Sequence, residues 1–259
     1  MRERLKPTFD FPQSGAGGTK PDPLIEARDR LIVALDAPGA REAAELVGSL
    51  EGVCQWFKVG LELFTADGPA VVQTLVARGY SVFLDLKFHD IPNTVAAAVR
   101  SASAWGARMI NVHAAGGPAM LAAAKMALEG INDPPQLLAV TVLTSMDTPQ
   151  LRATGVGHTP AEQVKLLAQL SLNAGICGFV CSAQEVEAMR ALTGPAGVLV
   201  TPGIRPAGSD SGDQRRVSAP ADALRAGASY LVVGRPITQA ASPAAAATAI
   251  LTEMAESLG

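Results

Sequence analysis

Short apolar runs alternate with longer helical patterns along most of the chain, and this alternation restricts the fold more than any other feature. The apolar runs, which predict strands, fall at 31–35, 56–59, 81–87, 109–112, 137–143, 178–181, 198–200 and 230–233. The helical patterns fall near 40–51, 67–78, 92–105, 116–129, 160–174, 183–192, 219–226 and 243–257. The sequence therefore predicts eight consecutive strand–helix units.

The predicted strands are apolar at nearly every position, as strands covered on both faces must be. Alternating strand–helix units imply a parallel sheet, and eight of them in about 250 residues predict a TIM (β/α)8 barrel, an α/β fold. An open doubly wound sheet is the alternative. No Gly-x-Gly-x-x-Gly motif follows the first strand, which argues against the dinucleotide-binding form of that alternative.

The sequence pattern at the start of the 259-residue chain differs from that of the rest. Residues 1–28 show little periodicity and contain a glycine cluster at 15–18 and prolines at 21 and 23, which predicts a flexible or surface-wrapping extension. The glycine cluster does not follow a strand, so we do not expect it to bind phosphate. We therefore divide the chain into an N-terminal extension, 1–28, and one barrel domain, 29–259.

The composition excludes several classes of protein. Hydrophobic residues make up 48% of the chain and charged residues 17%, with a net charge of −3, which excludes a mainly disordered chain and a polycation that coats nucleic acid. No apolar stretch reaches the ~18–20 residues of a membrane-spanning helix, and the basic start does not lead into the apolar segment of a secretory signal. We expect a cytoplasmic protein with no nucleic-acid or membrane partner.

The residues that most often bind metals or form disulfides are few. They are Cys54, Cys177, Cys181, His89, His113 and His158. The cysteines are too sparse for a disulfide framework, and the histidines lack a recognisable metal-ligand spacing. We expect no metal site, and supporting or structural roles for the histidines.

Charged side chains lie at the ends of the first three predicted strands. They are Asp36, Lys58, Asp85, Lys87 and, just beyond the third strand, Asp90. Asp85 and Lys87 are two residues apart and point to the same side of their strand. Charges inside a barrel are costly unless paired, so one interpretation is a structural ion-pair network. The functional interpretation is that a lysine held among carboxylates stays protonated and can stabilise and protonate a carbanion.

A second constellation suits an anion. The loops after the seventh and eighth strands contain Gly203, Arg205, Gly234 and Arg235, and these loops commonly bind phosphate in a TIM barrel. Glycine lets backbone N–H groups approach closely, and arginine can bind phosphate oxygens in a forked geometry. The polar segment 202–217 is long enough to form a lid over a ligand. The alternative is that these glycines only make tight turns.

Several ordered motifs resemble the orotidine 5′-phosphate decarboxylase family. The most specific is Asp-Leu-Lys-Phe-His-Asp-Ile-Pro-Asn-Thr at 85–94. Further similar segments are 34–36, 58–60, 142–145, 201–206, 213–215 and 233–237, and the resemblance extends from about residue 31 to 240. It implies an enzyme of pyrimidine biosynthesis that decarboxylates orotidine 5′-phosphate to UMP without a cofactor.

The resemblance also implies catalytic roles. Lys87 would protonate the carbon that loses CO₂ and stabilise its negative charge beforehand. Asp85 would lie beside the substrate carboxylate and hold Lys87. Lys58 and Asp90 would complete the charge array and contact the ribose. In this family the residues that match Asp90 and Thr94 reach into the neighbouring subunit's site, so a homodimer with shared active sites is implied.

The remaining implied contacts are with the nucleotide. Asp36 resembles a ribose contact, and Thr144 a pyrimidine contact. Gln214 resembles the residue that links base and phosphate. Gly234 and Arg235 resemble the residues that bind the phosphate. Pro202 and Arg205 resemble residues of the phosphate loop.

Two other functions are alternatives to the decarboxylation of orotidine 5′-phosphate. A magnesium-dependent branch of similar barrels, the 3-hexulose-6-phosphate synthases and related decarboxylases, typically carries a metal-binding glutamate where this chain has Lys58, which would repel the metal. The other alternative is a barrel that binds a phosphate or nucleotide without catalysis, against which the intact set of charged residues argues.

Overall fold

The computed structural model describes residues 22–206 and 218–259, and their strands form one closed parallel barrel in chain order. The strands are β1 Leu31–Ala34, β2 Trp56–Gly60, β3 Ser81–Phe88, β4 Met109–His113, β5 Gln136–Val140, β6 Gly178–Val180, β7 Val198–Thr201 and β8 Tyr230–Val233. Because β1 pairs with both β2 and β8, the sheet has no open edge. The TIM barrel is confirmed, and the open sheet is wrong.

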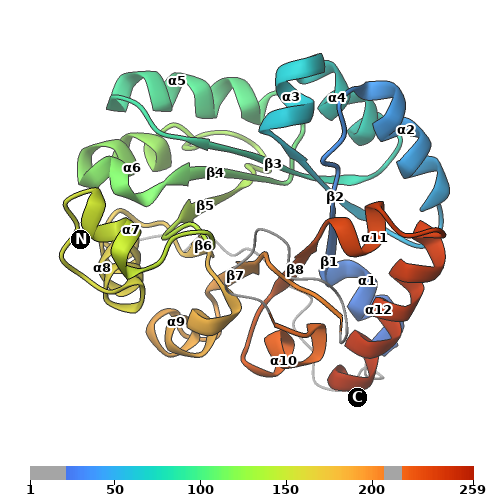
Figure 1. The fold of residues 1–259 in the computed structure, drawn as a ribbon. Helices are drawn as coiled ribbons and strands as arrows, with labels where there is room; N and C mark the ends of the chain where they lie inside the picture. Colours follow the sequence, from blue (N-terminus) through green and yellow to red (C-terminus); the bar gives the residue numbers. More distant parts are fainter. Residues whose placement is uncertain (1–21, 207–217) are drawn as a thin grey trace, which may run out of the picture.

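Helices surround the barrel as an outer ring (Figure 1). They are α1 Pro23–Arg30, α2 Ala40–Ser49, α3 Leu61–Asp67, α4 Pro69–Ala77, α5 Pro92–Ser103, α6 Gly117–Met126, α7 Thr148–Ala153, α8 Pro160–Asn173, α9 Val186–Thr193, α10 Pro220–Arg225, α11 Arg235–Thr238 and α12 Pro243–Leu258. Two 3₁₀ turns, Ala114–Gly116 and Ala183–Glu185, follow β4 and β6.

Strand side chains alternate between two apolar layers. In β1, Leu31 and Val33 pack outward against the helices, whereas Ile32 and Ala34 fill the barrel interior. Phe83 of β3 and Met109 of β4 belong to the same interior layer. Two residues beyond Ala34, Phe83 and Met109, the inward positions are polar and are occupied by Asp36, Asp85 and Asn111. Because every second residue of a strand faces inward, these strands form an apolar floor inside the barrel and place polar side chains at its carboxyl end.

The segment between β2 and β3 holds two helices where the sequence predicts one at 67–78. α3 begins directly after Gly60, and Gly68 separates it from α4 with a φ of 65°. A positive φ is easy for glycine and interrupts helical geometry. The predicted helix at 67–78 corresponds to α4, whereas α3 was not predicted.

The fifth strand is shorter than predicted. It ends at Val140 and not at 143, and Leu143, which is 37% exposed, accepts a hydrogen bond from the Met146 N–H at 2.9 Å. The sequence predicted Thr144 at the end of this strand. The turn places it instead in the loop before α7. α7 itself was not predicted, although Asp147 and Gln150 form its capping box.

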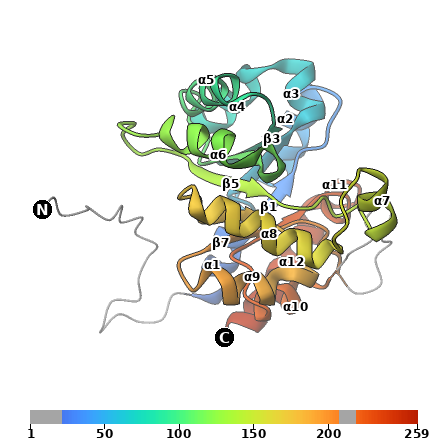
Figure 2. The ribbon, with the colours of Figure 1, turned by 90° about the vertical axis from the view of Figure 1, so that its left-hand side faces the viewer.

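The described part of the N-terminal segment is mostly helical. α1 begins at Pro23, inside the segment predicted as an extension, and the Asp22 side chain caps it by accepting the Leu24 N–H at 2.9 Å. α1 packs against α12 (Figures 1 and 2). Residues 1–21 and most of the expected lid at 202–217 lie outside the described residues.

Candidate active site

The carboxyl ends of neighbouring strands bring four of the predicted charged residues together. Lys58 of β2 lies beside Ala34 in the register of β1, and Asp85 of β3 lies beside Gly60 at the end of β2. Asp36 follows β1 by two residues. Because all these positions face inward, their side chains converge above the apolar floor of the barrel.

Two lysines and two aspartates form a continuous ion-pair chain. The Lys58 Nζ lies 3.1 Å from Asp36 Oδ1 and 3.5 Å from Asp85 Oδ2. The Lys87 Nζ lies 2.7 Å from Asp85 Oδ1. The exposed fraction of the side chain is 12% for Asp85 and Lys58, 31% for Lys87 and 53% for Asp36. Charge is thus concentrated in a buried pair at the centre and opens to solvent at both ends.

Asp85 is the central anion of this chain. Burial alone would raise its pKa, but the positive charges of Lys58 and Lys87, with hydrogen bonds from Lys87 and Asn111, outweigh burial and hold the pKa below its ordinary value. Asp85 is therefore ionised at neutral pH and presents a fixed negative charge beside the Lys87 ammonium.

The backbone of Lys87 adopts a conformation that is rare for a residue with a side chain. Its φ is 51°, and the pairing of β3 with β4 shifts register between Leu84 and Phe88. The Lys87 N–H donates to Asn111 Oδ1 at 2.7 Å, and Asn111 Nδ2 donates to Asp85 Oδ1 at 2.7 Å. Sequence reasoning missed Asn111, although a single amide in the apolar run 109–112 was the available signal.

Two histidines lie beside the array, at the ends of β3 and β4. The rings of His89 and His113 stack with centroids 5.3 Å apart. Burial, together with His89 and Lys87, lowers the pKa of His113, and its Nδ1 accepts the Ala115 N–H at 3.3 Å. A neutral ring with a fixed acceptor fits the supporting role that the sequence predicts.

Asp90 and Thr94 lie apart from the array within this chain. Both are exposed, and the Asp90 Oδ1 accepts the N–H of its neighbour Ile91 at 2.6 Å. Among the residues that the structure describes, no ion pair joins Asp90 to a lysine. Thr94 lies on the first turn of α5. The two residues face solvent at the end of β3.

The predicted anion loops lie at the same end of the barrel. Gly234, which lies between β8 and α11, is close to the array, because a Cβ added there would lie 3.5 Å from Asp36 Oδ2. Arg235 is exposed. Arg205 is half-buried and its N–H donates to Ser218 O at 3.0 Å, which ties the two described sides of the loop together.

Two of the other predicted nucleotide contacts lie in segments that follow strands. Pro202 follows β7 and is half-buried, and so is Thr144 in the loop after β5. Gln214 lies outside the described residues.

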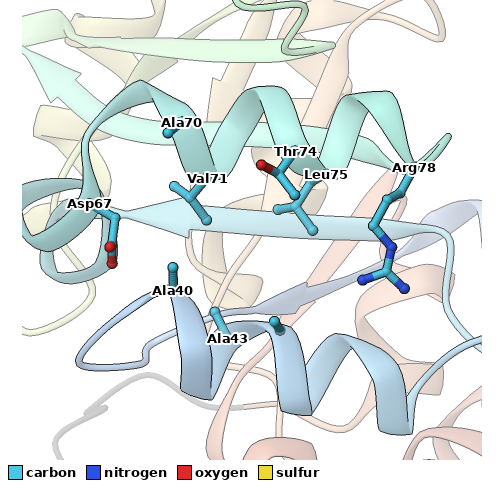
Figure 3. A pocket seen from close by; sticks show the side chains of 9 residues that line it. Ala40, Ala43, Asp67, Ala70, Val71, Thr74, Leu75 and Arg78 are labelled. Carbon is cyan, nitrogen blue, oxygen red and sulfur yellow. The ribbon is translucent and has the colours of Figure 1, made fainter.

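A surface groove between α2 and α4 is a separate feature (Figure 3). Its lining is mainly alanine and other apolar side chains, with Asp67, Thr74 and Arg78 as its polar members. It lies among the outer helices, away from the charge array, and holds no reacting set of side chains.

Among the residues that the structure describes, no three histidine, cysteine, aspartate or glutamate side chains group as metal ligands. No disulfide joins the three cysteines, and burial raises the pKa of Cys54 to about 12. None of the described helices is long and apolar enough to cross a membrane. The charge array is therefore the strongest candidate for catalysis.

Comparison with known proteins gives consistent results. The profile described as the Orotidine 5′-phosphate decarboxylase / HUMPS family matches residues 29–250. The orotidine 5′-phosphate decarboxylase of Moorella thermoacetica is 54% identical over 89% of this chain and 94% of its own length. That of Pectobacterium carotovorum is 54% identical over 83% of this chain and 87% of its own length.

A solved structure is similar over nearly the same region. The crystal structure of orotidine 5′-phosphate decarboxylase from Lactobacillus acidophilus superposes with a TM-score of 0.76 at 38% identity. The match covers 87% of this chain and 98% of that one. The similarity therefore spans the whole barrel.

Proposed function

Because this chain belongs to the Orotidine 5′-phosphate decarboxylase / HUMPS family, we propose that its charge array carries out the decarboxylation of orotidine 5′-phosphate. The enzyme is a carboxy-lyase that converts this substrate to UMP in pyrimidine biosynthesis. The observation that carries the mechanism is the buried Asp85 carboxylate, held 2.7 Å from the Lys87 ammonium and 3.5 Å from Lys58.

The reaction needs a fixed positive charge next to C6 of the pyrimidine. When the bond from C6 to the carboxylate breaks, its electron pair stays on C6 and CO₂ leaves. The resulting sp² carbanion has no conjugated electron sink, so an oriented ammonium in a water-poor site stabilises it. Lys87 then gives its proton to C6 and regains one from solvent. We propose no cofactor for this step.

Asp85 and Lys58 prepare Lys87 for this role. The ionised Asp85 forms a 2.7 Å ion pair with the Lys87 ammonium and so fixes its position. Lys58, held between Asp36 and Asp85 at 3.1 and 3.5 Å, offsets the cost of burying the Asp85 charge. We also assign the ribose hydroxyl groups to Lys58 and Asp36.

The rest of the nucleotide is bound away from the reacting carbon. We assign the pyrimidine to Thr144 and the link between base and phosphate to Gln214. The phosphate is assigned to Pro202, Arg205, Gly234 and Arg235. Binding energy from this remote phosphate can hold C6 against Lys87, which raises turnover as well as affinity.

We also propose a homodimer whose subunits share their active sites. Asp90 and Thr94 are exposed in the single chain, beside the charge array but without contact to it. Two large apolar side chains flank the same strand ends, Ile91 at 67% exposure and Leu61 at 58%. A second copy that covers them would carry its own Asp90 and Thr94 toward this array and complete it.

A magnesium-dependent reaction is the alternative within the family. Lys58 argues against it, because an ammonium lies between the two carboxylates, Asp36 and Asp85, that could otherwise ligate a cation. The curated relatives described above are named decarboxylases.

The cytoplasm is the location we propose. Its support is that Cys54, Cys177 and Cys181 form no disulfide, as is typical of proteins kept under reducing conditions.

Replacing Lys87 tests the assigned proton donor. We expect Lys87→Ala to lower kcat by about 10³-fold or more, since it removes both the proton and the positive charge, while UMP still binds. Lys165→Ala is the matched control, because Lys165 is exposed on α8. A Lys87→Ala variant with near-wild-type turnover, followed as loss of substrate absorbance, would refute the mechanism.

A further inference from the structure

Asn111 lies in the middle of β4 and is fully buried. Its strand neighbours, Ile110 and Val112, are apolar and also fully buried. A buried amide is costly unless its donor and acceptor are both paired. The hydrogen-bond partners of Asn111 therefore indicate its role in the protein.

Both partners of Asn111 belong to the charge array. Its Oδ1 accepts the backbone N–H of Lys87 at 2.7 Å, and its Nδ2 donates to Asp85 Oδ1 at 2.7 Å. The orientation of the amide is fixed by its partners, because a backbone N–H can only donate and an ionised carboxylate can only accept. One side chain thus binds the anion and the backbone of the lysine at once.

The hydrogen bond to Lys87 replaces regular pairing between β3 and β4. The register of these strands shifts between Leu84 and Phe88, and Lys87 has a φ of 51°. A left-handed backbone is unfavourable for a residue with a side chain and persists only where its surroundings hold it. The Asn111 carbonyl oxygen holds it here, and the side chain of Lys87 returns to Asp85 from this backbone.

The hydrogen bond to Asp85 fixes the carboxylate. Asp85 Oδ1 accepts from both Asn111 Nδ2 and Lys87 Nζ, which leaves Oδ2 facing Lys58. Without the amide, the carboxylate could rotate and the two lysines would lose their fixed separation.

We propose that Asn111 is a positioning residue for the decarboxylation, which orients Asp85 and holds the backbone of Lys87. This inference rests on the roles proposed for Asp85 and Lys87. Asn111 acts through these two residues and does not touch the substrate. It therefore matters for turnover and not for binding of the product.

The first test compares Asn111→Ala with Thr141→Val. Thr141, just after the neighbouring strand β5, is also buried and donates one hydrogen bond, to Val180 O at 3.1 Å, but it is not part of the array. We expect Asn111→Ala to lower kcat by about 10- to 100-fold, with a change of at most about threefold in the Kd of UMP. Thr141→Val should leave both constants near wild type.

The second test uses Asn111→Asp and pH. The introduced group is isosteric with asparagine, and Asp85 beside it and burial should raise its pKa. Once protonated, it can again donate to Asp85 and accept from Lys87. The charged or titratable groups around it are Asp85, Lys87, Lys58, His89 and His113, and the wild type shares them all. We therefore expect the ratio of variant to wild-type kcat to rise by about tenfold between about pH 8 and pH 5.

The inference fails on any of three results. These are a folded Asn111→Ala variant with near-wild-type kcat, equal losses of kcat and UMP affinity, and a variant-to-wild-type ratio for Asn111→Asp that does not change with pH. If Asn111→Ala does not fold, the Asn111→Asp ratio decides alone. An active Lys87→Ala variant would instead refute the proposed mechanism itself, so the two failures are distinguishable.

Discussion

A missing β-carbon at Gly60 leaves room for the ammonium of Lys58. A Cβ added to Gly60 would lie 2.7 Å from Lys58 Nζ and 3.6 Å from Asp36 Oδ1. The backbone there, with φ −96° and ψ −175°, is open to any residue. The need for glycine is therefore one of space at the charge array and not one of backbone conformation.

We predict that Gly60→Ala impairs catalysis more than folding. The end of the Lys58 side chain can swing away from the new methyl group, so the barrel should remain stable, but the ammonium then leaves the two carboxylates. We expect kcat to fall by about 10- to 100-fold. Steady-state kinetics and thermal unfolding of the same preparation measure both effects.

Gly48→Ala is the control for this variant. Gly48 is an exposed residue of α2 with nothing within 4 Å of an added Cβ. Alanine in a helix should stabilise the protein by about 0.5 to 1 kcal/mol without changing kcat. Unchanged kcat in Gly60→Ala would show that the position of Lys58 is not critical.

Residues differ in how much of their role the sequence reveals. The inward set Asp36, Lys58, Asp85 and Lys87 could be predicted, because charge at the end of an apolar strand has few structural explanations. Asn111 could not, since a lone amide in a strand carries no motif and its meaning depends on a backbone irregularity in β3. Such irregularities arise from tertiary contacts and leave little trace in local sequence.

At the scale of whole elements, α9 is joined to the loops before β7 and β8 by one side chain. Arg190 donates to the carbonyl oxygens of Gly194, Gly197 and Gly227 and to the hydroxyl of Ser229. Burial lowers the pKa of Arg190, yet a guanidinium remains charged at any working pH. These hydrogen bonds give the three loop carbonyl oxygens a charged donor, which makes a stronger hydrogen bond than a neutral one.

We predict that Arg190→Met destabilises the barrel while leaving its chemistry intact. Methionine keeps much of the apolar stem but leaves the loop carbonyls without their donor. We expect a loss of about 2 to 4 kcal/mol in the free energy of unfolding, measured by denaturant titration. Arg225→Met on α10, which removes an exposed pair with Asp222, should change that free energy by at most about 0.5 kcal/mol. Equal effects of the two substitutions would contradict this role.

The boundaries of elements were the least predictable part of the fold. The end of β5 falls inside a continuous apolar pattern, where local sequence cannot separate a buried loop from a strand. α3, a short helix directly before the predicted helix at 67–78, was missed. The closure of the barrel agrees with the repeated strand–helix pattern, because eight such units in about 250 residues are typical of a TIM barrel.

At the scale of the whole molecule, the described chain does not bring two residues of the proposed site, Asp90 and Thr94, to its own charge array. Asp90 and Thr94 face outward beside Ile91, and only a second subunit could bring another Asp90 to the array. The sequence could suggest this arrangement only through family resemblance, because one chain carries no direct signal of its partner's geometry.

Mixing two inactive variants tests the shared site. Asp90→Ala and Lys87→Ala should each be inactive as homodimers. In a hybrid dimer, one site combines an intact Lys87 with an intact Asp90 from the other subunit. Random exchange in equal amounts should therefore restore at most about a quarter of wild-type activity. Demonstrated subunit exchange with no recovery would show that each site is complete within one chain.

We propose that the array of Asp36, Lys58, Asp85 and Lys87 decarboxylates orotidine 5′-phosphate through fixed charge and a proton from Lys87, without a metal ion. The most direct measurement is turnover of this substrate by the wild-type protein after treatment with excess chelator, followed as loss of substrate absorbance. We predict full turnover that added Mg²⁺ does not increase. Absence of turnover, or activity that appears only with Mg²⁺, would contradict the account.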